Sequence, residues 1–316
     1  MTVIEYPRFK PDVKKNGRAV ALGFFDGVHI AHRALIEKTV RQARKTGAVA
    51  SVFTFIAESK TIKAKSPRIY TTEQKLKIFA SLGVDEIILA DFDKISNMTK
   101  EEFAKDFLID TLDCTAAVYG YNFRFGKDRE GDATYLDEVM TSRERLAIIQ
   151  DEVTLDGRTI SATVIREALK KGNCETAASL LGAPYFISGR VEKGLGKGHA
   201  LGFPTVNLTL PSESLLREGV YRSAIEIDGR MYSAVTNVGT CPTVCERESH
   251  LESFIIDYDG DLYGKELDVY LLGYLREEKR FSTYEELSEQ IKKDSLTAET
   301  LNQDYIKGNK NERKMD

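Results

Sequence analysis

The 316-residue sequence lacks the features that mark membrane, secreted or nucleic-acid-binding proteins. It contains no apolar run of about 18 residues, which a membrane-spanning helix requires, and its first residues lack the apolar core of a secretion signal. Lys and Arg together number 45 against 49 Asp and Glu, and the formal net charge is −4. This balance gives no support for a general nucleic-acid or membrane surface, and we therefore expect a cytoplasmic protein.

Cysteines are also few, and their spacing argues against a zinc site or a disulfide framework. The four cysteines stand at positions 114, 174, 241 and 245, without a C-x-x-C pair. Cys241 and Cys245 are four residues apart, but no histidine–cysteine set supplies the remaining ligands of a zinc site. We expect free thiols, as in an ordinary cytoplasmic protein.

Length and composition allow about two folded domains of roughly 100–200 residues each, and 42% hydrophobic residues provide a sizeable core. In the first half, strand-like and helix-like runs alternate. The strand-like runs cover residues 18–22, 48–55, 85–90 and 116–120, and the helix-like runs begin near residue 28 and cover 73–82 and 99–111. This alternation predicts an α/β domain whose parallel sheet binds ligands beyond the carboxyl ends of its strands.

The pattern changes near residue 183, where Ala183-Pro184 follows a helical stretch over residues 161–181. Asp228-Gly229 and Asp259-Gly260 are strong turn signals, and an amphipathic helix is expected over 283–294. The short β-type runs between them are 186–191, 206–210, 220–227, 231–238, 252–257 and 267–272. We predict a first domain over 1–182, a small antiparallel β-barrel over 183–306 and a frayed tail over 307–316.

The stretch over residues 18–43 joins a buried strand, a glycine-bearing loop and a helix start. Free backbone N–H groups and the helix dipole at such a junction favour an anion. Gly23 and Gly27 give the loop its turn freedom, and His29 and His32 share one face of the first helical turn. The pattern indicates phosphate binding, although two histidines there are also compatible with a surface or helix-capping role.

Further polar groups begin the helical stretch at residue 161. Ser161 and Thr163 carry hydroxyls at its start, where simple N-capping is the alternative to nucleotide binding. Arg166 lies one turn later, where its guanidinium could bind triphosphate oxygens in bidentate fashion or form a surface ion pair.

The second half carries a denser set of phosphate-type residues. Glycines at a loop permit close backbone approach to phosphates, although such a loop can also be a flexible hairpin. Thr205 and Asn207 are two residues apart on a strand, so their side chains share one face, which suits binding of a common cation. Glu252 is the first residue of an apolar strand, where burial of a carboxylate costs free energy unless the group is paired or has a function. The loop residues are Gly194, Gly196, Lys197 and Gly198.

In order and separation, these elements resemble prokaryotic bifunctional riboflavin kinase/FMN adenylyltransferases, also called FAD synthetases. The matching segments are Gly23-Phe-Phe-Asp-Gly-Val-His29-Ile-Ala-His32, Gly120-Tyr-Asn-Phe-Arg-Phe-Gly126, Ile160-Ser-Ala-Thr-Val-Ile-Arg166 and Gly202-Phe-Pro-Thr-Val-Asn207. The resemblance covers essentially the whole chain. It implies an N-terminal nucleotidyltransferase-type domain that makes FAD from FMN and ATP, and a C-terminal riboflavin kinase barrel that makes FMN from riboflavin and ATP.

The resemblance also implies roles for individual residues. It makes Glu252 the general base of the kinase, with Thr205 and Asn207 at Mg²⁺ and the ATP phosphates, and it gives the catalytic roles in adenylyl transfer to His29, His32 and Arg166. It places the flavin against Asn122, Asn237 and Arg276. Asn122 could instead be an ordinary turn asparagine, and Arg276 could instead form a surface ion pair. It places nucleotide at Gly23, Phe25, Asp26, Ser161, Thr163, Gly194, Gly196, Lys197 and Gly198.

The first half departs from the family pattern at three places. Ala31 and Ala162 stand where the family has Gly and Ser, and Phe55-Ile-Ala-Glu58 occupies the place of a Phe-x-Pro-His-Pro segment. Two alternatives therefore accompany the bifunctional prediction: a riboflavin kinase with weakened or lost adenylyltransferase activity, and a non-catalytic flavin-binding regulator. The oligomeric state is left open.

Overall fold

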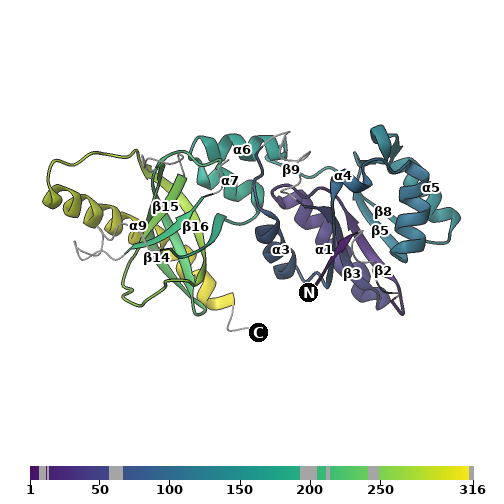
Figure 1. Cartoon of the computed structure of the whole chain (residues 1–316), viewed down its shortest axis with the longest axis horizontal. Coiled ribbons are helices and arrows are strands. Elements are labelled where there is room, and N and C mark those ends of the chain that lie inside the picture. Colours follow the sequence, from purple (N-terminus) through teal and green to yellow (C-terminus); the bar gives the residue numbers. More distant parts are fainter. Residues whose placement is uncertain are drawn as a thin grey trace. The chain divides into compact units, whose positions relative to one another are not determined.

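The computed structural model describes residues 1–6, 12, 14–56, 67–192, 205–210, 214–240 and 249–312. The chain divides into two compact units, Met1–Ala162 and Thr163–Asp316 (Figure 1). The boundary between two catalytic domains after residue 182 remains a prediction.

The first unit is built on a six-stranded parallel sheet with the strand order β1-β4-β3-β2-β5-β8 (Figure 1). Its inner strands are largely apolar on both faces, as expected where helices cover both sides, and every residue of β2 and β4 is buried, including the paired Arg18 and Glu86. The strands are β1 Thr2–Tyr6, β2 Arg18–Leu22, β3 Val49–Phe55, β4 Glu86–Ala90, β5 Cys114–Gly120 and β8 Leu146–Gln150. The predicted parallel α/β sheet is confirmed, although the sequence patterns did not reveal β1 and β8.

Side chains cap the start of several helices of the first unit. Thr71 and Gln74 form a capping box at α3 Thr72–Ser81, and Thr99 and Glu102 exchange the same pair of hydrogen bonds before the helix Glu102–Thr111. The remaining helices are α1 Ile30–Thr46, α4 Phe92–Ile95, the short η2 Lys127–Arg129 and α5 Ala133–Ser142. Two small hairpins complete the unit, β6 Arg124–Phe125 with β7 Gly131–Asp132, and β9 Thr154–Leu155 with β10 Arg158–Thr159.

The second unit is an antiparallel half-barrel with the strand order β11-β16-β13-β14-β15-β12. The strands are β11 Tyr185–Arg190, β12 Thr205–Thr209, β13 Gly219–Ile227, β14 Arg230–Thr240, β15 Ser249–Ile255 and β16 Glu266–Arg276. Asp228 and Gly229 have φ values of 48° and 78° and join β13 to β14, which confirms the predicted two-residue hairpin turn. A backbone bridge from Glu192 to Asn207 connects the chain after β11 to β12.

Two helical predictions were wrong in extent. The stretch 161–181 forms two helices, α6 Ala162–Lys170 and α7 Cys174–Leu181, because Gly172 adopts φ +74° and Asn173 caps α7. The last helix, α9, extends over Tyr284–Glu312 instead of 283–294, so its backbone continues into the segment predicted as a tail. Asn302, which is fully buried, fixes this extension by donating to Ser223 O and Ser233 Oγ, at 2.8 Å each.

None of the helices within the described residues is both long enough and apolar enough to cross a membrane. Cys114 and Cys174 are buried free thiols, as expected, whereas Cys241 and Cys245 lie outside the described residues.

Candidate functional site

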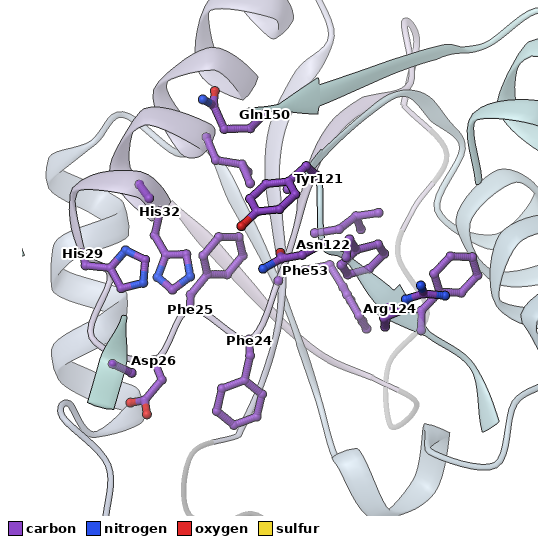
Figure 2. A pocket seen from close by; sticks show the side chains of 18 of the residues that line it. Phe24, Phe25, Asp26, His29, His32, Phe53, Tyr121, Asn122, Arg124 and Gln150 are labelled. Atoms are coloured by element: carbon purple, nitrogen blue, oxygen red, sulfur yellow. The ribbon is translucent and has the colours of Figure 1, made fainter. Parts of the chain in front are cut away.

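The first unit contains a cavity of about 650 Å³ at the carboxyl ends of four parallel strands. Leu22, Phe53, Gly120 and Gln150 reach it from the ends of β2, β3, β5 and β8. This is the edge of the sheet at which the sequence predicted a ligand. Figure 2 shows the labelled side chains that line it, with His29 and His32 toward one end and Arg124 toward the other.

The loop between β2 and α1 holds a strained backbone against the cavity. Phe25 and Val28 are fully buried and have positive φ values of 51° and 40°, which cost energy for residues with a Cβ. The Phe25 ring meets the His32 ring edge-on at 5.2 Å and lies so close to Gly23 that a Cβ there would be 2.9 Å from Phe25 Cζ. Strain of this kind persists where packing fixes a functional loop.

His29 and His32 form a stacked pair on the cavity wall. Their ring centroids are 3.6 Å apart at an interplanar angle of 14°. Both Nδ1 atoms are buried and have no hydrogen-bond partner among the described residues. Burial lowers the pKa of His29 to about 4, and burial together with His29 and Lys75 lowers the pKa of His32 well below its usual value. Both imidazoles are therefore neutral near pH 7.

Asp26 lines the cavity and also bonds to the protein, and its predicted role in nucleotide binding stays a prediction. Its carboxylate is buried, accepts a hydrogen bond from the Ile69 N–H at 3.1 Å and pairs with Arg68 Nη1 at 3.5 Å. Two cations surround the adjacent Phe24 ring, with Arg68 Cζ at 4.8 Å and Lys75 Nζ at 5.8 Å from its centroid.

Sequence reasoning missed both of these cations. Lys75 is 2% exposed and donates to Phe55 O at 3.0 Å, at the end of β3. A lysine on the core-facing side of the amphipathic α3 was the signal that could have identified it.

The other end of the cavity is aromatic. The Phe123 and Phe125 rings stack at 5.4 Å, and Phe103 lies 5.0 Å from Phe125. Asn122, predicted to contact a flavin, lines this cavity directly after β5 (Figure 2). Flat rings beside one amide suit a planar heteroaromatic ligand. The sequence analysis identified Asn122 and the segment that carries Phe123 and Phe125, but it missed three other aromatic residues of the lining, Phe53, Phe92 and Phe103.

The remaining predicted residues of the first site fall into two groups. Ser161, Ala31 and Ala162 line the cavity, so two of the three departures from the family pattern lie on its wall. Phe55 also lines it, whereas residues 57 and 58 lie outside the described residues. Thr163 and Arg166 belong to the second unit, and their roles stay predictions.

In the second unit, three adjacent strands align polar residues around Glu252. Asn207 of β12 and Asn237 of β14 are the register partners of Glu252 on its two sides. Thr205 Oγ1 donates to Glu252 Oε1 at 2.7 Å. Directly opposed residues of an antiparallel sheet place their side chains on the same face, about 5 Å apart at Cβ. The structure thus brings together four of the predicted kinase residues. Gly194, Gly196, Lys197 and Gly198 lie outside the described residues.

Arg276, predicted to contact the flavin, is engaged by the protein. Its Nε and Nη2 atoms bind Asp294 Oδ2 of α9 at 3.0 and 2.7 Å, and both side chains are largely buried. This arrangement corresponds to the ion-pair alternative, and flavin binding by Arg276 stays a prediction. Within the described residues, no group of three His, Cys, Asp or Glu side chains is arranged to hold a metal ion.

The chain has two parts. The first is an α/β unit with a cavity at its strand ends, and the second is an antiparallel half-barrel with a row of carboxylate, hydroxyl and amide groups. This combination is typical of an enzyme that binds phosphates. Family models match both parts: FAD synthetase over residues 12–164 and riboflavin kinase over residues 181–302.

Relatives with the same two parts match nearly the whole chain. The bifunctional riboflavin kinase/FMN adenylyltransferase of Escherichia coli K12 is 35% identical over 90% of this chain and 92% of its own. The Bacillus subtilis enzyme of that name is 30% identical over 88% and 90%. A crystal structure described as a macrolide-efflux protein from Streptococcus pneumoniae is 29% identical, with a TM-score of 0.80 over 94% of this chain and 99% of its own.

The chain belongs to the bifunctional riboflavin kinase/FMN adenylyltransferase family. It is an enzyme with both activities, which make FMN and FAD, and the predicted family and function are confirmed.

Proposed function

We propose that each unit carries one of the two reactions, with adenylyl transfer to FMN in the cavity of the first unit and riboflavin phosphorylation at the Glu252 row of the half-barrel. The observation that carries this assignment is the Thr205–Glu252 hydrogen bond of 2.7 Å, flanked by Asn207 and Asn237. It places a carboxylate, a hydroxyl and two amides on one face of the half-barrel, in the segment that matches the riboflavin kinase model.

In the first unit, the two ends of the cavity suit the two ends of FMN. The isoalloxazine ring packs among the aromatic side chains beside Asn122, and the phosphates lie toward His29 and His32. There a phosphate oxygen of FMN attacks the α-phosphorus of ATP, the bond to pyrophosphate breaks, and FAD forms. Neutral imidazoles donate hydrogen bonds to the oxygens that gain charge.

The surrounding residues hold the nucleotide in this proposal. The loop of Gly23, Phe25 and Asp26 lies against the phosphates in this proposal, since it precedes the N-terminus of α1. The Gly23 N–H itself donates to Phe53 O at 3.3 Å. Ser161 offers a hydroxyl on the cavity wall. Nucleotide binding by Thr163 and charge neutralisation on the triphosphate by Arg166 stay predictions from the sequence.

In the second unit, Glu252 takes the proton from the ribityl 5′-hydroxyl as that oxygen attacks the γ-phosphorus of ATP and ADP leaves. Phosphate binding by Gly194, Gly196, Lys197 and Gly198, which lie outside the described residues, stays a prediction from the sequence.

Thr205 and Asn207 offer the hydroxyl and amide oxygens that Mg²⁺ prefers. Because the Thr205 proton is donated to Glu252, the lone pairs of its oxygen remain available to a cation. When bound, Mg²⁺ would neutralise charge on the ATP phosphates.

The ligands of this proposal are riboflavin, FMN, FAD and ATP, with neither nucleic acid nor membrane involved. We assign both reactions to the cytoplasm, because both consume ATP.

The Glu252→Ala variant tests the kinase assignment. We expect FMN formation to fall by roughly 10²- to 10⁴-fold, the usual effect of removing a general base, while FMN supplied from outside is still converted to FAD. Glu226→Gln, which alters a strand glutamate of β13, is the control and should keep both activities. FMN formation at the normal rate in Glu252→Ala would contradict the assignment.

A further inference from the structure

The amide of Asn237 lies between two carboxylates, those of Glu252 and Glu278. Glu252 is its register partner on β15, and Glu278 follows the end of β16 and accepts a hydrogen bond from Asn237 Nδ2 at 2.8 Å. We propose that Glu278 is a positioning residue for riboflavin phosphorylation, one that fixes the Asn237 amide so that its oxygen accepts a hydrogen bond from the flavin substrate. This inference rests on the proposed kinase site.

Chemistry decides which way the amide points. An ionised carboxylate can only accept hydrogen bonds, so the NH₂ group of Asn237 must face Glu278 and its Oδ1 must turn away. Without that partner, the amide could rotate by half a turn at almost no steric cost. The contact with Glu278 therefore converts a group that could donate or accept into one that presents an acceptor.

The position of Glu278 is itself fixed by its surroundings. Gly239 lies on β14, and a Cβ at this position would overlap Glu278 Oε1. The Glu278 carboxylate therefore fits there because Gly239 has no side chain. Arg276, at the end of β16, is held as well, because it pairs with Asp294 of α9. Two side chains thus tie this end of the strand to α9 and β14, and Glu278 is held in place over Asn237.

A hydrogen-bond acceptor at Asn237 Oδ1 favours ligands that present a hydrogen-bond donor there. Riboflavin offers the hydroxyls of its ribityl chain and the ring N–H of its isoalloxazine, and each is a donor that Asn237 Oδ1 can bind. A flipped amide would present NH₂ to the same groups, lose this hydrogen bond, and leave a polar donor without a partner.

Three variants of the full-length enzyme test the proposal. Glu278→Ala should raise the KM for riboflavin about tenfold, the usual effect of losing one hydrogen bond. The KM for ATP and the conversion of FMN to FAD should stay within about twofold of the unmodified enzyme. Glu278→Gln keeps an acceptor oxygen for Asn237 but can also donate to it, so its KM for riboflavin should lie between those of Glu278→Ala and the unmodified enzyme. Glu277→Ala, which removes only the adjacent exposed ion pair with Arg217, is the matched control and should behave as the unmodified enzyme.

The outcomes separate this inference from the proposed function. An unchanged or lowered KM for riboflavin in Glu278→Ala would overturn it, as would a Glu278→Gln variant as impaired as Glu278→Ala. If Glu278→Ala raised the KM for ATP as much as the KM for riboflavin, Glu278 would have only a structural role, and the inference would again be wrong. Failure of the kinase site itself would instead appear as normal FMN formation in Glu252→Ala.

Discussion

Burial sets the protonation state of the two cavity histidines. The pKa of His29 falls to about 4 because an imidazolium would lose its hydration, and the pKa of His32 falls for the same reason, with His29 and Lys75 adding repulsion. Neutral rings can stack at 3.6 Å without charge repulsion. In the unfolded chain both groups bind protons near pH 6.5, so the folded state loses stability as the pH falls from about 6.5 toward 4.

Histidine NMR of the intact enzyme measures this directly. We expect the imidazole signals of His29 and His32 to show no titration between pH 5.5 and 8, because their folded pKa values lie below this range. The chain has four histidines, and single His→Gln variants assign each signal. A midpoint near pH 6.5 for either residue would contradict the buried, neutral pair.

The strained β2–α1 loop depends on one glycine contact. Gly27 has φ +83°, and a Cβ there would lie 2.8 Å from Ile69 Cδ1. Ile69 is buried and donates its backbone N–H to Asp26, so a methyl group at Gly27 would press on the contact between Ile69 and the loop that carries His29.

Gly27→Ala should therefore slow conversion of FMN to FAD by roughly 10- to 100-fold, since small displacements of catalytic groups are costly. Gly157→Ala provides the control, because Gly157 also has positive φ (+71°) but open space around its Cβ position. Both variants carry the backbone cost of about 1 kcal/mol, and only Gly27→Ala should lose adenylyl transfer. Equal rates in both would show that the loop tolerates the displacement.

Elements whose signals are local could be predicted from the sequence. β2 was located to the residue, and the Asp228-Gly229 turn was correct because positive φ at two positions favours such a pair. β8 was missed because, as an edge strand, its pattern is mixed, with Leu146 and Ile149 exposed. The length of α9 was underestimated because its anchor, Asn302, is a buried polar residue that no hydrophobic period reveals.

The sites show the same division. His29, His32 and Glu252 could be found because their residue types are chemically distinctive and sit in recognisable motifs. Asp26 was assigned to the nucleotide, yet its carboxylate is engaged by Ile69 and Arg68, contacts that are 42 or more residues away in the chain and invisible to local pattern. The Glu278–Asn237 pair was missed for the same reason.

Each unit has its own sheet and its own core, which suggests that they can be destabilised separately. Asn302 is fully buried, with its Nδ2 bound to Ser223 O and Ser233 Oγ and its Oδ1 accepting from Arg222 Nη1 at 3.2 Å. Removing it leaves buried polar groups without partners, at a cost of roughly 2–4 kcal/mol.

Asn302→Ala should lower the temperature at which riboflavin phosphorylation is lost, while the inactivation temperature of FMN adenylyl transfer stays unchanged. Thr300→Ala is the matched control on α9, because the Thr300 hydroxyl is exposed and bonds only to Leu296 O of its own helix. A parallel loss of both activities in Asn302→Ala would show that the units unfold together.

The central claim is that the two chemistries occupy separate sites on one chain, and complementation between two inactivated variants tests it most directly. Glu252→Gln and His29→Gln are each incubated with riboflavin, ATP and Mg²⁺, alone and mixed, and the flavins are separated. We expect almost no FMN or FAD from Glu252→Gln, FMN without appreciable FAD from His29→Gln, and FAD from the mixture, because FMN released by one variant reaches the intact cavity of the other. No FAD from the mixture, or FAD formed at the normal rate by His29→Gln alone, would contradict the assignment.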